Sequence, residues 1–272
     1  PAGEWSKTRE GWAALSDQML AARLGRDSAV VALGGGVVND VAGFVAATYL
    51  RGVALVQVPT SLLAMIDSSI GGKTGVDVPA GKNLLGAFHQ PRVVIADPDF
   101  LGSLASVQLA AGLAEAVKHG VVADAEYFAF LEADYAAIFA KHAPALERLV
   151  RRSVEIKASV VSQDEREQGR RAILNFGHTV GRAIEATSKY EVLHGEAVAI
   201  GMVGEARIAA RAGLGSLALP DRLARLLATL GLPTVVPPRH RPSDIIEVAR
   251  RDKKSRGGRI ACALPVHLGA MA

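Results

Sequence analysis

The sequence predicts an α/β protein in two parts, a parallel-sheet domain over residues 1–100 and a mostly helical domain over residues 101–272. In the first part, short apolar runs rich in β-branched residues alternate with helical segments. Beyond about residue 100, helical patterns dominate, and half of the 272 residues are apolar, which allows a large core. The cleft between two such domains is the usual place for a small ligand.

The strands of the first part are expected at three short runs. Residues 28–33 form a β-branched run that ends in three glycines, and residues 53–58 and 92–96 form two more. The Ala- and Val-rich residues 37–50 are expected to form a helix. This order gives the strand–helix–strand unit of a parallel sheet.

The second part is expected to consist mainly of helices, with strand-like residues returning only at 259–264. The helices are predicted over residues 107–119, 143–164, 171–188, 194–212 and 220–230. The change in pattern places the domain boundary near Leu101.

Composition argues against several classes of protein. The net charge of +4 comes without a long basic tract interleaved with aromatic residues, so no nucleic-acid partner is expected. No uninterrupted apolar stretch is long enough to span a membrane. The single cysteine, Cys262, excludes an internal disulfide framework and fits a reducing cytoplasm. The chain starts at Pro1 with no signal peptide, and we expect an N-terminal piece to be missing.

A glycine turn, Gly34-Gly35-Gly36, stands between the first predicted strand and helix. Such a turn presents free backbone N–H groups to an anion, and glycine lets a phosphate come close. The dinucleotide pattern G-x-G-x-x-G would require glycine at Asn39, so the match is imperfect. The turn indicates pyrophosphate binding, with a simple tight turn as the alternative.

A second glycine-rich segment, residues 70–83, is expected to be a loop. It is not an ATP-binding P-loop, because Asp67 stands where that motif needs its first glycine. The loop carries Lys73, Lys82 and Asn83, two cations and an amide that could hold a phosphate or a carboxylate. A solvated loop with surface lysines is the alternative.

Polar residues recur along the predicted helix 171–188. Arg171, Asn175, His178 and Arg182 follow one another at steps of four, three and four, which places them on one helical face. A polar stripe on an otherwise apolar helix is costly to bury, so it indicates the wall of a wet cleft. An ordinary solvent-exposed face is the alternative.

A metal site is suggested by one carboxylate and two imidazoles. Glu115 shares a helical face with Lys118, and Glu115, His178 and His194 could supply the three N/O ligands that catalytic zinc commonly takes. The three residues lie on separate segments. Each histidine alone could also be a hydrogen-bonded structural residue.

Together these segments resemble the 3-dehydroquinate synthase family, within the wider group of sugar-phosphate cyclases. The resemblance covers nearly the whole chain. Its most specific stretches are ALGGGVVNDVAGFVAATYLRG, QVPTSLLAMIDSSIGGKTGVDVPAGKNLLGAFHQP, AAGLAEAVKHG, ILNFGHT and LHGEAVAIGM.

The resemblance implies an enzyme of the carbon–oxygen lyase class that acts on phosphates. It implies conversion of 3-deoxy-D-arabino-heptulosonate 7-phosphate to 3-dehydroquinate and phosphate, by transient oxidation, elimination, reduction and aldol cyclisation. The cofactors implied are NAD⁺ and Zn²⁺ or Co²⁺, held between a Rossmann-like domain and a helical domain. A cytoplasmic homodimer of the shikimate pathway, on the route to the aromatic amino acids, is also implied.

The resemblance also assigns roles to individual residues. The metal ligands would be Glu115, His178 and His194. The NAD contacts would be Glu4, Lys7, Gly35, Gly36, Asp40, Thr60, Ser61, Asp67, Lys73, Lys82 and Ser103. The catalytic group would be Lys73, Lys118, Lys157, Arg171 and Asn175. Further substrate contacts would be Arg51, Asp67, Lys82, Asn83, Arg182, Lys253 and Lys254. Arg51 would reach into the site of the neighbouring subunit.

The chain departs from the family pattern at Arg182, where the family usually has a second histidine one turn after the metal ligand. Arginine stays protonated and cannot relay a proton as histidine can. The departure keeps two alternatives open. One is another sugar-phosphate cyclase, of the 2-deoxy-scyllo-inosose or 2-epi-5-epi-valiolone synthase type. The other is a catalytically impaired NAD-binding homologue.

Overall fold

The structure is a computed structural model that describes residues 3–188, 191–238, 240–251 and 260–272. The chain divides into two compact units, Pro1–Leu104 and Ala105–Ala272. Each unit is described by itself. Lys253 and Lys254, which the sequence places among the substrate contacts, lie outside the described residues.

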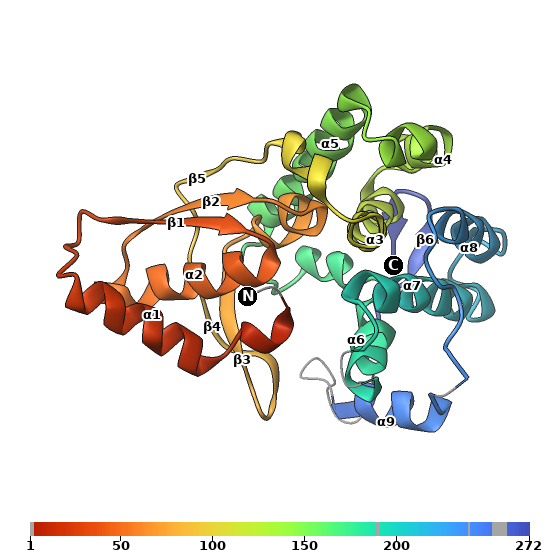
Figure 1. The fold of residues 1–272 in the computed structure, drawn as a ribbon. Coiled ribbons are helices and arrows are strands. Elements are labelled where there is room, and N and C mark those ends of the chain that lie inside the picture. The colour runs from red at the N-terminus through yellow and green to blue at the C-terminus, as the bar shows by residue number, and fades with distance from the viewer. Residues whose placement is uncertain (1–2, 189–190, 239, 252–259) are drawn as a thin grey trace. The chain divides into compact units, whose positions relative to one another are not determined.

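A parallel sheet forms the centre of the first unit, in the order β1 (Ala29–Gly34), β2 (Ala54–Pro59) and β5 (Val93–Val94) (Figure 1). Helix α2 (Gly36–Thr48) connects β1 to β2 and packs against them. The predicted strand–helix–strand unit is confirmed. The third strand is shorter than the expected 92–96, because only two of its residues pair with β2.

Helix α1 (Arg9–Ala21) was not expected from the sequence. Its first turn is capped by Thr8, whose hydroxyl accepts the N–H of Gly11 at 3.0 Å. The helix packs on α2, where the rings of Trp12 and Phe44 lie 5.3 Å apart. The short helical turns of this unit are η1 (Glu4–Ser6), η2 (Tyr49–Arg51), the π-helical η3 (Ala64–Ser68) and η4 (Pro98–Ser103).

The segment expected to be a glycine-rich loop, residues 70–83, is largely a β-hairpin. Strands β3 (Lys73–Val78) and β4 (Gly81–Phe88) pair antiparallel. A Cβ at Gly86 would lie 2.1 Å from the carbonyl oxygen of Thr74, so the two strands approach too closely there for any side chain. The loop prediction was wrong because these glycines hide the alternation typical of a strand.

The second unit is mostly helical, as predicted. Its helices are α3 (Ser106–Ala123), α4 (Ala125–Phe139), α5 (Ala143–Gln163), α6 (His178–Thr187), α7 (His194–Arg211), α8 (Leu219–Thr229) and α9 (Pro242–Arg251). Helices α4 and α9 were not expected. Strands β6 (Pro265–His267) and β7 (Ala270–Met271) form a small antiparallel pair. The strand expected at 259–264 is wrong for residues 260–264, which form no strand in the described part of the chain.

The helix predicted over 171–188 is broken. A 3-10 turn, η5 (Arg170–Asn175), precedes a left-handed residue, Gly177, with φ 79°, and α6 begins at the next residue. A Cβ at Gly177 would lie 2.8 Å from the carbonyl oxygen of Val198. The polar residues expected on one continuous helix face therefore lie on two elements joined by a turn, which only glycine allows.

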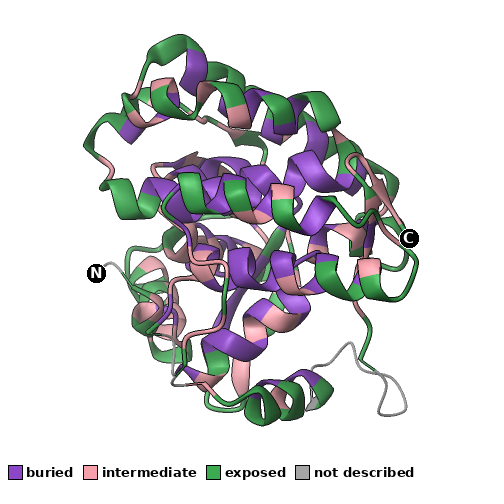
Figure 2. Ribbon diagram, turned by 90° about the vertical axis from the view of Figure 1, so that its right-hand side faces the viewer, coloured by how far each residue is buried: buried purple, intermediate pink, exposed green. Residues whose placement is uncertain are grey.

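Helix α7 is buried along most of its length. Figure 2 shows the buried residues of the interior helices in purple. At two glycines the backbone of α7 lies in direct contact with the backbone of neighbouring segments. A Cβ at Gly201 would lie 1.9 Å from the carbonyl oxygen of Gly177, and one at Gly195 would lie 2.0 Å from that of Ala111 on α3. These contacts fix α6 and α3 against α7 with little room for adjustment. Among the described residues, no helix is both long and apolar enough to cross a membrane.

Candidate active site

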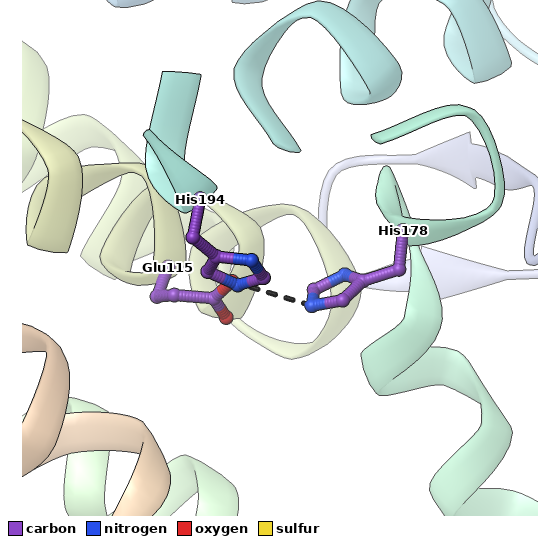
Figure 3. A group of neighbouring side chains, drawn as sticks. All are labelled: Glu115, His178 and His194. Atoms are coloured by element: carbon purple, nitrogen blue, oxygen red, sulfur yellow. Dashed lines mark ion pairs between the residues drawn. The ribbon is translucent and has the colours of Figure 1, made fainter. Parts of the chain in front are cut away.

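The three predicted metal ligands meet inside the second unit. Glu115 lies in the middle of α3 and is fully buried, while His178 and His194 are the first residues of α6 and α7. The Nε2 atoms of His178 and His194 lie 3.5 Å and 3.4 Å from Oε1 of Glu115. Figure 3 shows both imidazoles pointing toward each other and toward the carboxylate, with their ring centroids 5.3 Å apart.

Each imidazole is oriented by a partner at its other nitrogen. Nδ1 of His178 lies 3.1 Å from the carbonyl oxygen of Phe176 and donates to it. Nδ1 of His194 lies 3.4 Å from Oε2 of Glu185, which is almost fully buried on α6. Such outer partners orient metal-binding histidines and direct Nε2 toward the metal position.

Two of the three distances between donor atoms have the spacing that zinc requires. Three N/O ligands bonded at about 2.1 Å lie about 3.4 Å apart at the corners of a tetrahedron. The distances from Oε1 of Glu115 to the two imidazole nitrogens match this value. The same oxygen is buried and accepts no hydrogen bond. The three side chains therefore fit a divalent cation, and three protein ligands are the number that catalytic zinc commonly takes.

The electrostatics of the cluster also favour a cation. Burial would raise the pKa of Glu115, but the positive charge of Lys118 and interactions with the two histidines outweigh it and hold the pKa well below its ordinary value. Burial lowers the pKa of His178 to about 3. Burial would lower the pKa of His194 too, but Glu115 and Glu185 raise it to about 10. A dication that binds here displaces a proton from His194.

The predicted catalytic residues of this unit lie on several elements, and Lys118 contacts the cluster directly. Lys118 is buried one turn after Glu115 and donates to its Oε2. Lys157 is buried on α5. The buried Arg171 lies in η5, where its guanidinium donates to the carbonyl oxygen of Glu165 at 2.5 Å. Burial holds these cations at defined positions, as anion recognition requires.

Arg182 and Asn175 are in contact although the helix between them is broken. The guanidinium of Arg182 donates to Oδ1 of Asn175 at 3.1 Å, and Nδ2 of Asn175 donates to Glu167 at 2.6 Å. The amide is held from both ends, so its orientation is defined. Glu167 was not predicted, because it precedes the helical pattern that drew attention to the other two.

Two buried carboxylates, Glu185 and Glu205, on the helices that carry the two histidines were not identified from the sequence. Glu185 follows His178 by two helical turns, a spacing that could have indicated a shared face. Glu205 lies in an apolar stretch of α7 and is fully buried. Burial raises the pKa of Glu205 to about 7, against the opposing effects of backbone N–H donors and the charge of Arg182.

The glycine turn of the first unit has the geometry of an anion cradle. Helix α2 begins at Gly36 after Gly35, which has no side chain to occupy the N–H groups of the first turn. A Cβ at Gly36 would lie 3.2 Å from the hydroxyl oxygen of Ser68. Ser68 therefore lies close to this helix N-terminus, which no side chain caps and which can receive a phosphate.

Four predicted nucleotide contacts lie together near this helix. Lys7 is buried, with Nζ 2.5 Å from Asp40 and 3.8 Å from Glu4, and Lys82 lies 3.5 Å from Glu4. Burial raises the pKa of Asp40 to about 6, although the charge of Lys7 opposes it. The cluster offers both donors and acceptors, as recognition of ribose hydroxyls needs.

The other predicted residues of the first unit are spread over its loops and turns. Thr60 and Ser61 directly follow β2, and Asp67 lies in η3. Lys73 begins β3, and Ser103 ends η4. Two more have positive φ: Asn83, whose backbone N–H donates to Asp77 at 2.8 Å, and the exposed Arg51 at the end of η2.

Solved structures with a closely similar fold are known. A 2-epi-5-epi-valiolone synthase from Streptomyces hygroscopicus subsp. jinggangensis 5008, with NAD⁺ and Zn²⁺ bound, covers 100% of this chain and 76% of its own at 33% identity and a TM-score of 0.93. A 2-deoxy-scyllo-inosose synthase complexed with carbaglucose-6-phosphate, NAD⁺ and Co²⁺ covers 100% and 75% at 32% identity and a TM-score of 0.90. The fold therefore places the chain in the class of sugar-phosphate cyclases.

Within that class the sequence is more specific. The family model of the 3-dehydroquinate synthase N-terminal part matches residues 1–111, and that of the C-terminal part matches residues 112–255. The chain belongs to the 3-dehydroquinate synthase family. It is 55% identical to a 3-dehydroquinate synthase from Symbiobacterium thermophilum and 51% identical to one from Desulforamulus reducens, covering 99% of this chain and 75% of each relative.

A more distant likeness concerns the fold alone. A probable glycerol dehydrogenase from Sinorhizobium meliloti 1021 matches with a TM-score of 0.67 at 17% identity, over 93% of this chain and 76% of its own.

Proposed function

We propose that this chain catalyses the reaction of its family, the conversion of 3-deoxy-D-arabino-heptulosonate 7-phosphate to 3-dehydroquinate and phosphate. The observation that carries the proposal is the cluster of Glu115, His178 and His194, whose donor atoms lie within 4.8 Å of one another. The cluster occurs in a chain that is 55% identical to a 3-dehydroquinate synthase over 99% of this chain.

The cofactors we propose are NAD⁺ in the first unit and Zn²⁺ or Co²⁺ at the three-residue cluster. The related cyclases with NAD⁺ and Zn²⁺ or Co²⁺ bound support this choice. Bound NAD⁺ supplies a reversible hydride acceptor, and a bound metal supplies a Lewis acid. The N-terminus of α2 would hold the pyrophosphate, and the Glu4, Lys7, Asp40 and Lys82 cluster would hold the sugar hydroxyls.

The substrate carries a phosphate and a carboxylate, so several positioned cations are needed. We propose that Lys157, Arg171 and Arg182 hold these anions, and that Asn175 holds a hydroxyl with the donor end of its amide. Lys118 would stabilise negative charge that develops near Glu115, since it is buried and its ammonium group donates to that carboxylate. We also propose that Lys73 belongs to the catalytic group and that Asn83 contacts the substrate. The remaining proposed NAD contacts are Thr60, Ser61, Asp67 and Ser103.

An assay of phosphate release tests the function. The purified chain should release phosphate from the heptulosonate phosphate when NAD⁺ and Zn²⁺ are both present, with no accumulation of NADH, because the hydride returns to the product. Leaving out NAD⁺ or chelating the zinc should stop release. Protein that binds NAD⁺ and zinc but releases no phosphate would instead be an impaired homologue.

Arg182 favours a second candidate, another cyclase acting on a different sugar phosphate. It stands where a proton-relaying imidazole is usual in the family, and two of the solved neighbours are a valiolone synthase and an inosose synthase. Release of phosphate from sugar phosphates that lack the carboxylate, but not from the heptulosonate phosphate, would establish this alternative.

Replacing Arg182 by His should lower kcat/KM for the heptulosonate phosphate by about tenfold, mostly through KM. The reason is that Arg182 holds Oδ1 of Asn175, and a hydrogen bond from a charged donor is worth about 1.5–3 kcal/mol. Steady-state kinetics of Arg182→His, Asn175→Ala and the double variant would test the coupling. Increased turnover by Arg182→His would mean that the missing imidazole limits the rate.

The homodimer, and a role for Arg51 in the neighbouring subunit's site, stay predictions. Arg51 is exposed and held in a left-handed conformation at φ 68°, next to Leu50 at φ 48°. Two adjacent non-glycine residues in this region are costly, and such strain is common at functional positions. This supports a role for the turn beyond connection.

A further inference from the structure

The N-terminal turn of α6, which carries His178, is tied to α7 by a single buried carboxylate. Oε2 of Glu205 accepts the backbone N–H of Gly177 at 2.7 Å, and Oε1 accepts that of Val180 at 3.1 Å. Glu205 is fully buried. The two oxygens therefore hold the backbone on both sides of His178.

From this geometry we propose that Glu205 is a positioning residue for the metal ligand His178. It sets the turn at Gly177 and the first turn of α6, so that Nε2 of His178 points at Oε1 of Glu115. The inference rests on the metal-binding role proposed above. It goes beyond that role by assigning a function to a side chain that touches neither metal nor substrate.

The turn at Gly177 needs the restraint that Glu205 provides, because glycine alone does not fix one backbone conformation. Gly177 has φ 79°, in the left-handed region, and glycine is the residue with the most conformational freedom there. The direction of the His178 side chain depends on the backbone angles of this turn. Charge-assisted hydrogen bonds from both sides of the histidine remove that freedom, and in a buried setting they are strong.

The placement of Glu205 also links two ligands. Glu205 follows His194 by eleven residues on α7, which is close to three full turns, so the two side chains leave the same face of the helix. The same face contacts α6 through Gly201. One helix thus supplies a metal ligand at its start and the restraint on a second ligand farther along.

The chemistry requires a carboxylate in particular. The two oxygens serve different N–H groups, and glutamine could offer an oxygen to only one of them. Its amide NH₂ would face the other backbone N–H, donor against donor, in a buried site. Glu205→Gln therefore keeps the size of the side chain and removes one half of the restraint.

The test measures the zinc affinity of the metal-free chain by competition with a chelator at pH 8, above the pKa of Glu205. Glu205→Gln should bind zinc at least ~10-fold more weakly than the unaltered chain, as is typical when an outer partner of a ligand is lost. Glu205→Asp keeps both oxygens on a shorter side chain and should fall between the two. It also keeps the test informative if the glutamine variant does not fold.

Asp124→Asn is the matched control. Asp124 caps α4 in the same unit, accepting the N–H of Tyr127 at 2.9 Å with one oxygen and Arg152 at 2.6 Å with the other. Its loss should lower the melting temperature and leave zinc affinity unchanged. Unaltered zinc affinity in Glu205→Gln, or an equal loss in Asp124→Asn, would overturn the proposal. Failure of the unaltered chain to bind zinc would overturn the metal site itself, and this inference with it.

Discussion

Replacing His178 by Ala should reduce phosphate release by about a thousandfold or more and remove tight zinc binding. The side chain supplies one of only two nitrogens in the described metal cluster, and its Nε2 lies 3.5 Å from Oε1 of Glu115. A catalytic metal contributes several kcal/mol to a reaction, and each 1.36 kcal/mol is a factor of ten in rate. Phosphate release and the zinc content of the purified protein are the measurements.

Melting temperatures measured with and without zinc distinguish a variant that no longer binds the metal from one that no longer folds. Zinc should raise the melting temperature of the unaltered chain, since a ligand that binds only the folded state stabilises it by mass action. The His178→Ala protein should fold without that response. His142→Ala is the control, because His142 is exposed at the start of α5 and makes no capping hydrogen bond. Full activity of His178→Ala would exclude the metal cluster from catalysis.

Replacing Gly201 by Ala should destabilise the second unit by about 3 kcal/mol or more and weaken zinc binding. The new Cβ would lie 1.9 Å from the carbonyl oxygen of Gly177 and 2.9 Å from the backbone nitrogen of Gly181. Both are backbone atoms that cannot rotate away, so α6 must move as a whole, and overpacking of this kind commonly costs about 1–3 kcal/mol or more. Movement of α6 carries His178 with it. Denaturant unfolding and zinc competition measure the two effects.

The same helix offers a matched control at Gly204. A Cβ there would meet nothing within 4 Å, although the residue is only three positions farther along α7. Gly204→Ala should stabilise the protein by about 0.5–1 kcal/mol, because glycine in a helix interior is unfavourable relative to alanine. If Gly201→Ala melted like Gly204→Ala, the close contact between α6 and α7 would not exist.

Some elements could be predicted because their signal is local. Strands β1 and β2 are short, mainly apolar runs that contain valines, and α3, α5, α7 and α8 have clear helical patterns, so each was expected close to its observed position. The hairpin β3–β4 was missed because glycines interrupt its alternation. The break before α6 was missed because a helical spacing of polar residues continues across Gly177 in the sequence, while the backbone turns there.

Some residues of the candidate site could likewise be predicted from the sequence, and others could not. Motifs resembling those of a known family indicated Glu115, His178 and His194, and the structure brings these three together. Glu185, Glu205 and Glu167 had no comparable signal. Each acts through a hydrogen bond or ion pair to a residue that is distant in the sequence or across a turn, such as His194, Gly177 or Asn175.

The sequence by itself determined the class of fold, the family and the chemical types needed for the site, because these follow from local patterns and from motifs. Only the tertiary structure decided how the ligands are held. The approach of α7 to α6 and α3 at Gly201 and Gly195, and the carboxylates of Glu185 and Glu205, depend on contacts between separate helices. Such contacts form when packing brings distant residues to within hydrogen-bonding distance, and no local pattern in the chain encodes those distances.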